Sequence, residues 1–117
     1  MKTILIVEDL DLNIDLLTQL LENDYSLIMA KDGAQGVALA DEKRPDLVIM
    51  DIALPVMDGY EATRRIRAKI PSMPIIGLSS HAMSGDAEKA RAAGCNDYIT
   101  KPIDEDALRR TLQQYLG

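Results

Sequence analysis

Polar side chains that could bind a metal ion and a phosphate fall at the ends of several short apolar runs of this chain. Two acids follow the first run, one follows the third, two serines follow the fourth and a lysine follows the fifth: Glu8, Asp9, Asp51, Ser79, Ser80 and Lys101. Carboxylates held close together repel one another, and their pKa values rise unless a cation intervenes. These residue types therefore predict a site in which a divalent cation and a lysine ammonium face three carboxylates.

Such a set of groups suits the transfer of a phosphoryl group to a carboxylate. Mg²⁺ typically takes one or two carboxylates, several waters and phosphate oxygens as ligands. Phosphoryl transfer asks a protein mainly for positioning and charge stabilisation, which the cation and Lys101 would supply. An aspartate carboxylate can act as the nucleophile, and Asp51, on the predicted central strand, is the best placed of the three.

The elements that must position these groups alternate along the chain. Short apolar runs predict strands at 3–7, 26–30, 47–50, 75–78 and 97–99. Stripes at helical spacing lie between and after them: Leu12, Leu16, Leu17, Leu20 and Leu21; Ala34, Val37 and Ala38; Ala62, Ile66 and Ile70; Ala87, Ala90 and Ala93; Leu108, Leu112 and Leu116. Gly94 reads as a helix C-cap and Asp104 as an N-cap. The pattern predicts an α/β fold with helices on both faces of a parallel sheet.

Size and composition narrow the class of protein. The 117 residues suit one domain, spanning 1–117, and the net charge of −6 argues against a nucleic-acid or membrane binder. The single cysteine, Cys95, allows no disulfide within the chain. No apolar stretch is long enough for a secretory signal or a membrane span, so we expect a cytoplasmic protein.

Each candidate residue also has an ordinary structural interpretation. Glu8 and Asp9 could simply cap the following helix, Ser79 could be a turn residue, and Lys101 could be a surface lysine. Their joint position at the ends of neighbouring strands favours a site, provided that the strands follow the order 2-1-3-4-5.

Five sequence motifs, in order, resemble the receiver domain of two-component response regulators over essentially the whole chain. They are ILIVED at 4–9, DLVIMDI at 46–52, LPVMDG at 54–59, PIIGLSS at 74–80 and DYITKP at 97–102. The resemblance implies a flavodoxin-like (βα)5 three-layer sandwich, similar to CheY, and it is also the source of the strand order 2-1-3-4-5.

The resemblance assigns a role to each matching residue. Asp51 is expected to accept a phosphoryl group from a phosphohistidine on a sensor histidine kinase or histidine phosphotransfer protein. Asp9, Asp51 and the backbone carbonyl of Ala53 are expected to bind Mg²⁺ or Mn²⁺ directly, and Glu8 through water. Further assignments are phosphate binding by Lys101, Ser79 and Ser80, tuning of the phosphate lifetime by Ala53 and His81, and a cis peptide bond before Pro102. Slow autodephosphorylation would follow, rather than enzymatic turnover.

A conformational switch is implied as well. Ser79 is expected to move toward the phosphate and the ring of Tyr98 to turn inward, which changes the surface of helix 4, strand 5 and helix 5 that a downstream effector reads. The predicted fourth helix has only an alanine stripe, so it buries little apolar area and could shift at low cost. The protein is expected to be a monomer or a weak homodimer.

Three rival functions remain. An Asp-dependent phosphohydrolase would need a second acid two residues after the nucleophile, where this chain has Ala53, and a flavin carrier would need a Ser/Thr-rich loop where it has Glu8 and Asp9. A receiver-like domain that no longer switches is disfavoured by the intact Asp51 and Lys101. His81 also has the simpler interpretation of an exposed loop residue, and Cys95 that of a small structural one.

Overall fold

Five strands and five helices alternate strictly along the chain. The computed structural model describes residues 1–54, 56–79 and 86–117, apart from the side chain of Asp86. The strands are β1 (Thr3–Val7), β2 (Ser26–Ala30), β3 (Leu47–Asp51), β4 (Ile75–Ser79) and β5 (Asp97–Thr100). The helices are α1 (Asp11–Leu21), α2 (Gly33–Lys43), α3 (Gly59–Lys69), α4 (Asp86–Ala93) and α5 (Glu105–Leu116). The predicted order of elements is confirmed.

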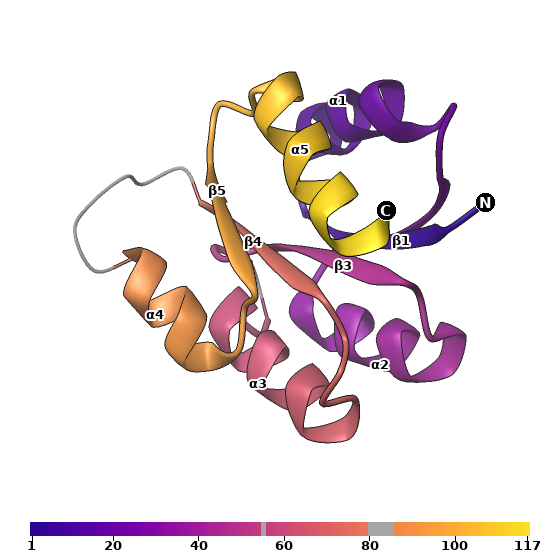
Figure 1. The fold of residues 1–117 in the computed structure, drawn as a ribbon. Helices are drawn as coiled ribbons and strands as arrows, with labels where there is room; N and C mark the ends of the chain where they lie inside the picture. Colours follow the sequence, from indigo (N-terminus) through magenta and orange to yellow (C-terminus); the bar gives the residue numbers. More distant parts are fainter. Residues whose placement is uncertain (55, 80–85) are drawn as a thin grey trace.

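The strands form one parallel sheet in the order β2-β1-β3-β4-β5, as expected. Helices α1 and α5 cover one face and α2, α3 and α4 cover the other (Figure 1). The architecture is therefore the three-layer sandwich that the sequence predicts. Strand β2 lies on one side of β1, whereas β3, β4 and β5 follow one another on the other side, so the strand order changes direction between β1 and β3. In folds of this kind, ligands bind in the crevice beyond the carboxyl ends of the strands at that point.

Apolar side chains fill two core layers, one on each face of the sheet. Strands β3 and β4 are buried at every position, and β1 is buried from Ile4 to Val7. One layer packs the sheet against α2, α3 and α4, and the other packs it against α1 and α5. Continuous apolar runs form these strands because both faces of a parallel sheet are covered. The central strands thus hold their carboxyl ends on a rigid support.

The apolar stripe predicted for α1 is partly wrong. Leu17 and Leu21 are buried, but Leu12 is 80% exposed and Leu16 is 39% exposed. Five residues at about 100° each place Leu12 about 140° around the helix from Leu17, which is beyond the face that the sheet covers. Part of this leucine-rich helix therefore faces solvent.

The stripe predicted for α2 also needs correction. Ala34 and Ala38 are exposed, whereas the buried face includes Gly33, Gly36 and Ala40. A Cβ atom on Gly36 would lie 2.8 Å from Cγ2 of Val7, so the absence of a side chain lets α2 approach β1 closely. A search for apolar periodicity does not register such glycine contacts.

The predicted positions of the third, fourth and fifth helices are confirmed, and so are two of their ends. Asp104 caps α5 by accepting a hydrogen bond from the backbone N–H of Asp106, and α4 ends just before Gly94, whose φ is +118°.

Among the described residues, we find no helix with the length and apolarity needed to cross a membrane.

Candidate functional site

Three acidic side chains meet at the carboxyl ends of two neighbouring strands. Glu8 and Asp9 directly follow β1, and Asp51 is the last residue of β3. One carboxylate oxygen from each lies within 4.8 Å of the others, which is close enough for all three to bind one metal ion. The sequence prediction that these acids converge is confirmed, although Asp51 ends its strand rather than following it.

Lys101 brings a positive charge into the same crevice from the far side of β4. Its Nζ lies 3.3 Å from Oε2 of Glu8 and 3.5 Å from Oδ2 of Asp51. The expected cis peptide bond between Lys101 and Pro102 is present. Ser79 ends β4 and is buried, and its carbonyl accepts a hydrogen bond from the backbone N–H of Lys101. The topology thus places one ammonium beside the acids and brings Ser79, at the end of β4, next to the end of β3.

The connection from β3 to α3 fixes the carboxylate of Asp51. The backbone N–H of Ala53 donates a 3.1 Å hydrogen bond to Oδ1 of Asp51. Gly59 begins α3 so close to the strand that a Cβ atom there would lie 2.1 Å from the carbonyl oxygen of Asp51. Only a residue without a side chain permits this approach, so the start of α3 lies directly against the end of β3.

Burial and crowding change the acidity of Asp51. Its side chain is only 6% exposed, and its pKa rises from 3.8 to about 7. The largest cause is desolvation, followed by the hydrogen bond to Glu8 and the repulsion between the two carboxylates; Lys101 and the N–H of Ala53 act in the opposite direction. One lysine therefore does not compensate the charge of this crevice, as the sequence argument anticipated.

Asn13 is a residue of the site that the sequence analysis missed. It lies in the first turns of α1, and its Nδ2 donates a 2.8 Å hydrogen bond to Oε1 of Glu8, whose residue is fully buried. The backbone N–H of Leu10 approaches the same oxygen at 3.4 Å. The available signal was an amide side chain five residues after Glu8, at the start of a helix leading out of the site.

The remaining predicted residues fall in different environments. Tyr98 is partly buried and packs against the core layer beside α2, α3 and α4, near Gly77. Ala53 is exposed beside Asp51. Ser80 and His81 lie outside the residues that the structure describes, so their predicted roles stay predictions.

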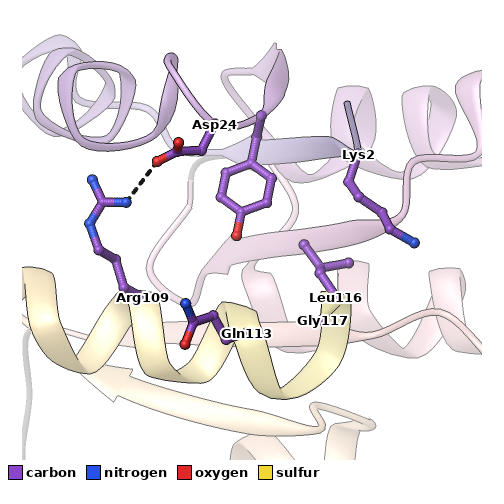
Figure 2. A pocket seen from close by; sticks show the side chains of 7 residues that line it. Lys2, Asp24, Arg109, Gln113, Leu116 and Gly117 are labelled. Carbon is purple, nitrogen blue, oxygen red and sulfur yellow. Dashed lines mark hydrogen bonds and ion pairs between the residues drawn. The ribbon is translucent and has the colours of Figure 1, made fainter.

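A separate pocket of about 370 Å³ lies near the amino ends of β1 and β2, at the opposite edge of the sheet. Figure 2 shows Arg109 of α5 reaching Asp24 across it. All three guanidinium nitrogens of Arg109 are occupied, since they also donate to Glu105 and to the carbonyl of Leu20. These contacts tie α5 to the end of α1, and none of the residues predicted for the site lines this pocket.

Comparison with known proteins agrees with this geometry. The family model described as the response regulator receiver domain matches residues 4–113. The chain belongs to this family. This receiver domain is 40% identical over 119 residues to the polar-differentiation response regulator DivK of Brucella anthropi, covering 99% of the chain and 97% of that relative.

Solved receiver domains share the fold closely. The receiver domain of sensor histidine kinase PA1611 from Pseudomonas aeruginosa has a magnesium ion coordinated in its active site cleft; it matches with a TM-score of 0.92 and 41% identity, covering 99% of this chain and 98% of that one. The receiver domain of the Saccharomyces cerevisiae response regulator Ssk1, solved with the histidine phosphotransfer protein Ypd1, matches with a TM-score of 0.91 and 31% identity, covering 97% and 88%. The protein is therefore a receiver domain of two-component signalling.

Proposed function

We propose that this receiver domain accepts a phosphoryl group on Asp51 and holds Mg²⁺, or Mn²⁺ in its place, beside it. The observation that carries the proposal is the convergence of three carboxylates within 4.8 Å, with the Nζ of Lys101 3.5 Å from Oδ2 of Asp51. The magnesium ion in the cleft of the PA1611 receiver supports it. Asp51 is the proposed nucleophile because it ends a central strand at the switch point of the sheet.

The donor set fits a hard divalent cation. Asp9, Asp51 and the backbone carbonyl of Ala53 would be direct ligands, and Glu8 would act through water. All are oxygen donors, which Mg²⁺ requires. Burial first, and the neighbouring carboxylate of Glu8 second, raise the pKa of Asp51, and a bound dication would favour its ionised form.

The proposed reaction is a displacement at phosphorus. A carboxylate oxygen of Asp51 forms a bond to the phosphorus of a phosphohistidine, the phosphorus–nitrogen bond breaks, and its electron pair returns to the imidazole nitrogen. Lys101 pairs with the phosphoryl oxygens and Ser79 donates a hydrogen bond to one of them. A bound cation would neutralise further charge on these oxygens. Water later hydrolyses the acyl phosphate slowly. Ala53 is exposed beside Asp51, so its side chain can tune the access of this water to the phosphoryl group.

The phosphodonor is proposed to be a histidine kinase or a histidine phosphotransfer protein that docks on the start of α1. Leu10, Leu12 and Leu16 are exposed by 56%, 80% and 39%, and Leu10 adjoins the proposed ligand Asp9. Exposed apolar side chains grouped beside a reaction site indicate a docking surface for a protein partner. The complex of the Ssk1 receiver with Ypd1 shows that a receiver of similar fold binds a phosphotransfer protein.

The output is proposed to be a shift of α4, β5 and α5 that a downstream effector reads. The alanine stripe of α4 leaves small buried contacts, Ala90 and Ala93, so the helix can move at low cost. Tyr98, partly buried on β5, is the proposed aromatic partner of the movement of Ser79. Amide exchange in α4 no faster than in α1 would count against this part of the proposal.

Mass measurement after incubation with Mg²⁺ and phosphoramidate or acetyl phosphate tests the phosphoacceptor. The wild-type chain should gain one phosphoryl group, and Asp51→Asn should gain none. Asp11→Asn is the control, because it alters an exposed acid near the site whose partner is the exposed Lys31. Phosphorylation that persists in Asp51→Asn would exclude Asp51 as the acceptor.

A second comparison separates the chemistry from the docking. Leu12→Ser should slow transfer from a phosphorylated histidine phosphotransfer protein, while the rate with phosphoramidate stays unchanged because the small donor needs no docking surface. Replacing the exposed Val56 by serine serves as the control for loss of an exposed apolar side chain outside α1. Equal transfer rates from the protein donor for wild type and Leu12→Ser would refute docking at α1.

A further inference from the structure

We propose that Asn13 is a positioning residue that holds Glu8 in the orientation needed for metal binding. The inference rests on the proposed function, because it concerns how the acidic group is prepared for the cation. Asn13 belongs to α1, whereas Glu8 follows β1, so their hydrogen bond joins the helix to the acidic group at the end of the strand.

The carboxylate of Glu8 has a different partner on each oxygen. Oε1 accepts the 2.8 Å hydrogen bond from Nδ2 of Asn13, while Oε2 faces the Nζ of Lys101 at 3.3 Å. The amide therefore occupies one oxygen and directs the other toward the interior of the crevice. Because the amide carries no net charge, it stabilises this orientation without neutralising the carboxylate.

A glutamate needs such support more than an aspartate would. Its extra methylene adds one rotatable bond, and fixing an additional torsion costs side-chain entropy when the metal binds. A hydrogen bond already present in the metal-free protein reduces that cost, as partners of metal-binding side chains generally do. Released from Asn13, both oxygens of the carboxylate could turn toward Lys101, and the existing ion pair, strengthened in this way, would compete with both metal and phosphate.

The position of Asn13 in the helix favours this role over a purely structural one. It is half-buried, in the first turns of α1, where asparagine is a poorer helix former than alanine. Its side chain points back to the site, since its amide Nδ2 donates a hydrogen bond to Glu8. Replacing it by alanine should therefore leave the helix intact while removing the contact.

A double-mutant cycle measured by Mg²⁺ titration, followed through backbone amide NMR signals, tests the inference. Asn13→Ala should weaken Mg²⁺ binding by about tenfold. In a Glu8→Ala background the same replacement should change the Mg²⁺ affinity no further. Thr18→Ala, which removes a hydrogen bond to the carbonyl of Ile14 elsewhere on α1, is the matched control and should leave the affinity unchanged.

Urea unfolding in EDTA reports any structural cost separately, and Asn13→Leu provides a second variant of similar volume that lacks the donor. Loss of affinity in both variants, confined to the background with Glu8, supports the inference. Wild-type affinity in Asn13→Ala, or an equal loss with and without Glu8, overturns it. Absence of Mg²⁺ binding by the wild type would overturn the proposed function as well.

Discussion

The acidity of Asp51 predicts that replacing its charge stabilises the metal-free protein at neutral pH. The carboxyl has a pKa of about 7 in the folded chain against 3.8 as its ordinary value. Between these values the folded state binds more protons than the unfolded state, so this group makes stability fall as pH rises from about 4 to 7. Above pH 7 this loss of stability is complete. Asp51→Asn removes the titrating carboxyl and with it the loss of stability.

The size of the effect follows from the shift. About three pKa units at about 1.4 kcal/mol each set an upper limit of about 4 kcal/mol. Because Lys101 and Glu8 can rearrange around the new charge, we expect a difference in the free energy of unfolding of about 2 kcal/mol between Asp51→Asn and wild type at pH 8. Near pH 4 the two proteins should differ little.

Urea unfolding in EDTA at several pH values from about 4.5 to about 8.5, a range of about four units around the transition, measures this difference. Other titrating groups are common to both proteins and cancel in the comparison. Glu88→Gln, at an exposed acid of α4, is the control and should follow the wild-type curve. Adding Mg²⁺ at pH 8 should raise the stability of the wild type and have little effect on Asp51→Asn. Curves for wild type and Asp51→Asn that stay parallel across the whole range would refute the reasoning.

Three further predictions concern the rest of the chain. Val56 is 87% exposed with a φ of +67°, so Val56→Asn should raise the free energy of unfolding by about 1 kcal/mol in urea, and an unchanged value would show that the backbone there carries no strain. Arg67 donates hydrogen bonds to the carbonyl of Gly94 at 2.6 Å and to that of Pro71 at 2.7 Å. Arg67→Ala should therefore lower the free energy of unfolding by about 2 kcal/mol in the same assay. An unchanged free energy of unfolding would show that these hydrogen bonds do not stabilise the fold. Burial raises the pKa of the Cys95 thiol, so a thiol reagent at pH 8 should modify the native chain at least about 100-fold more slowly than the urea-unfolded chain; comparable rates would mean that the thiol is accessible.

Local patterns in the sequence determined which elements form and which groups end the strands. Apolar runs and helical spacing were sufficient to predict the alternation of strands and helices, because burial on both faces of a parallel sheet requires such runs. The motifs around Glu8, Asp9, Asp51 and Lys101 were sufficient to predict the family. These features can be predicted from the sequence, since each depends on residues near one another in the chain.

The tertiary structure alone decided which atoms meet and which side chains are covered. The bond from Asn13 to Glu8 depends on how α1 leaves β1, and the exposure of Leu12 depends on how far the sheet reaches around that helix. The pKa of Asp51 depends on burial and on the number of charges brought to one crevice from separate strands. Desolvation and side-chain contacts are set by distances in three dimensions, and spacing along the chain does not contain those distances.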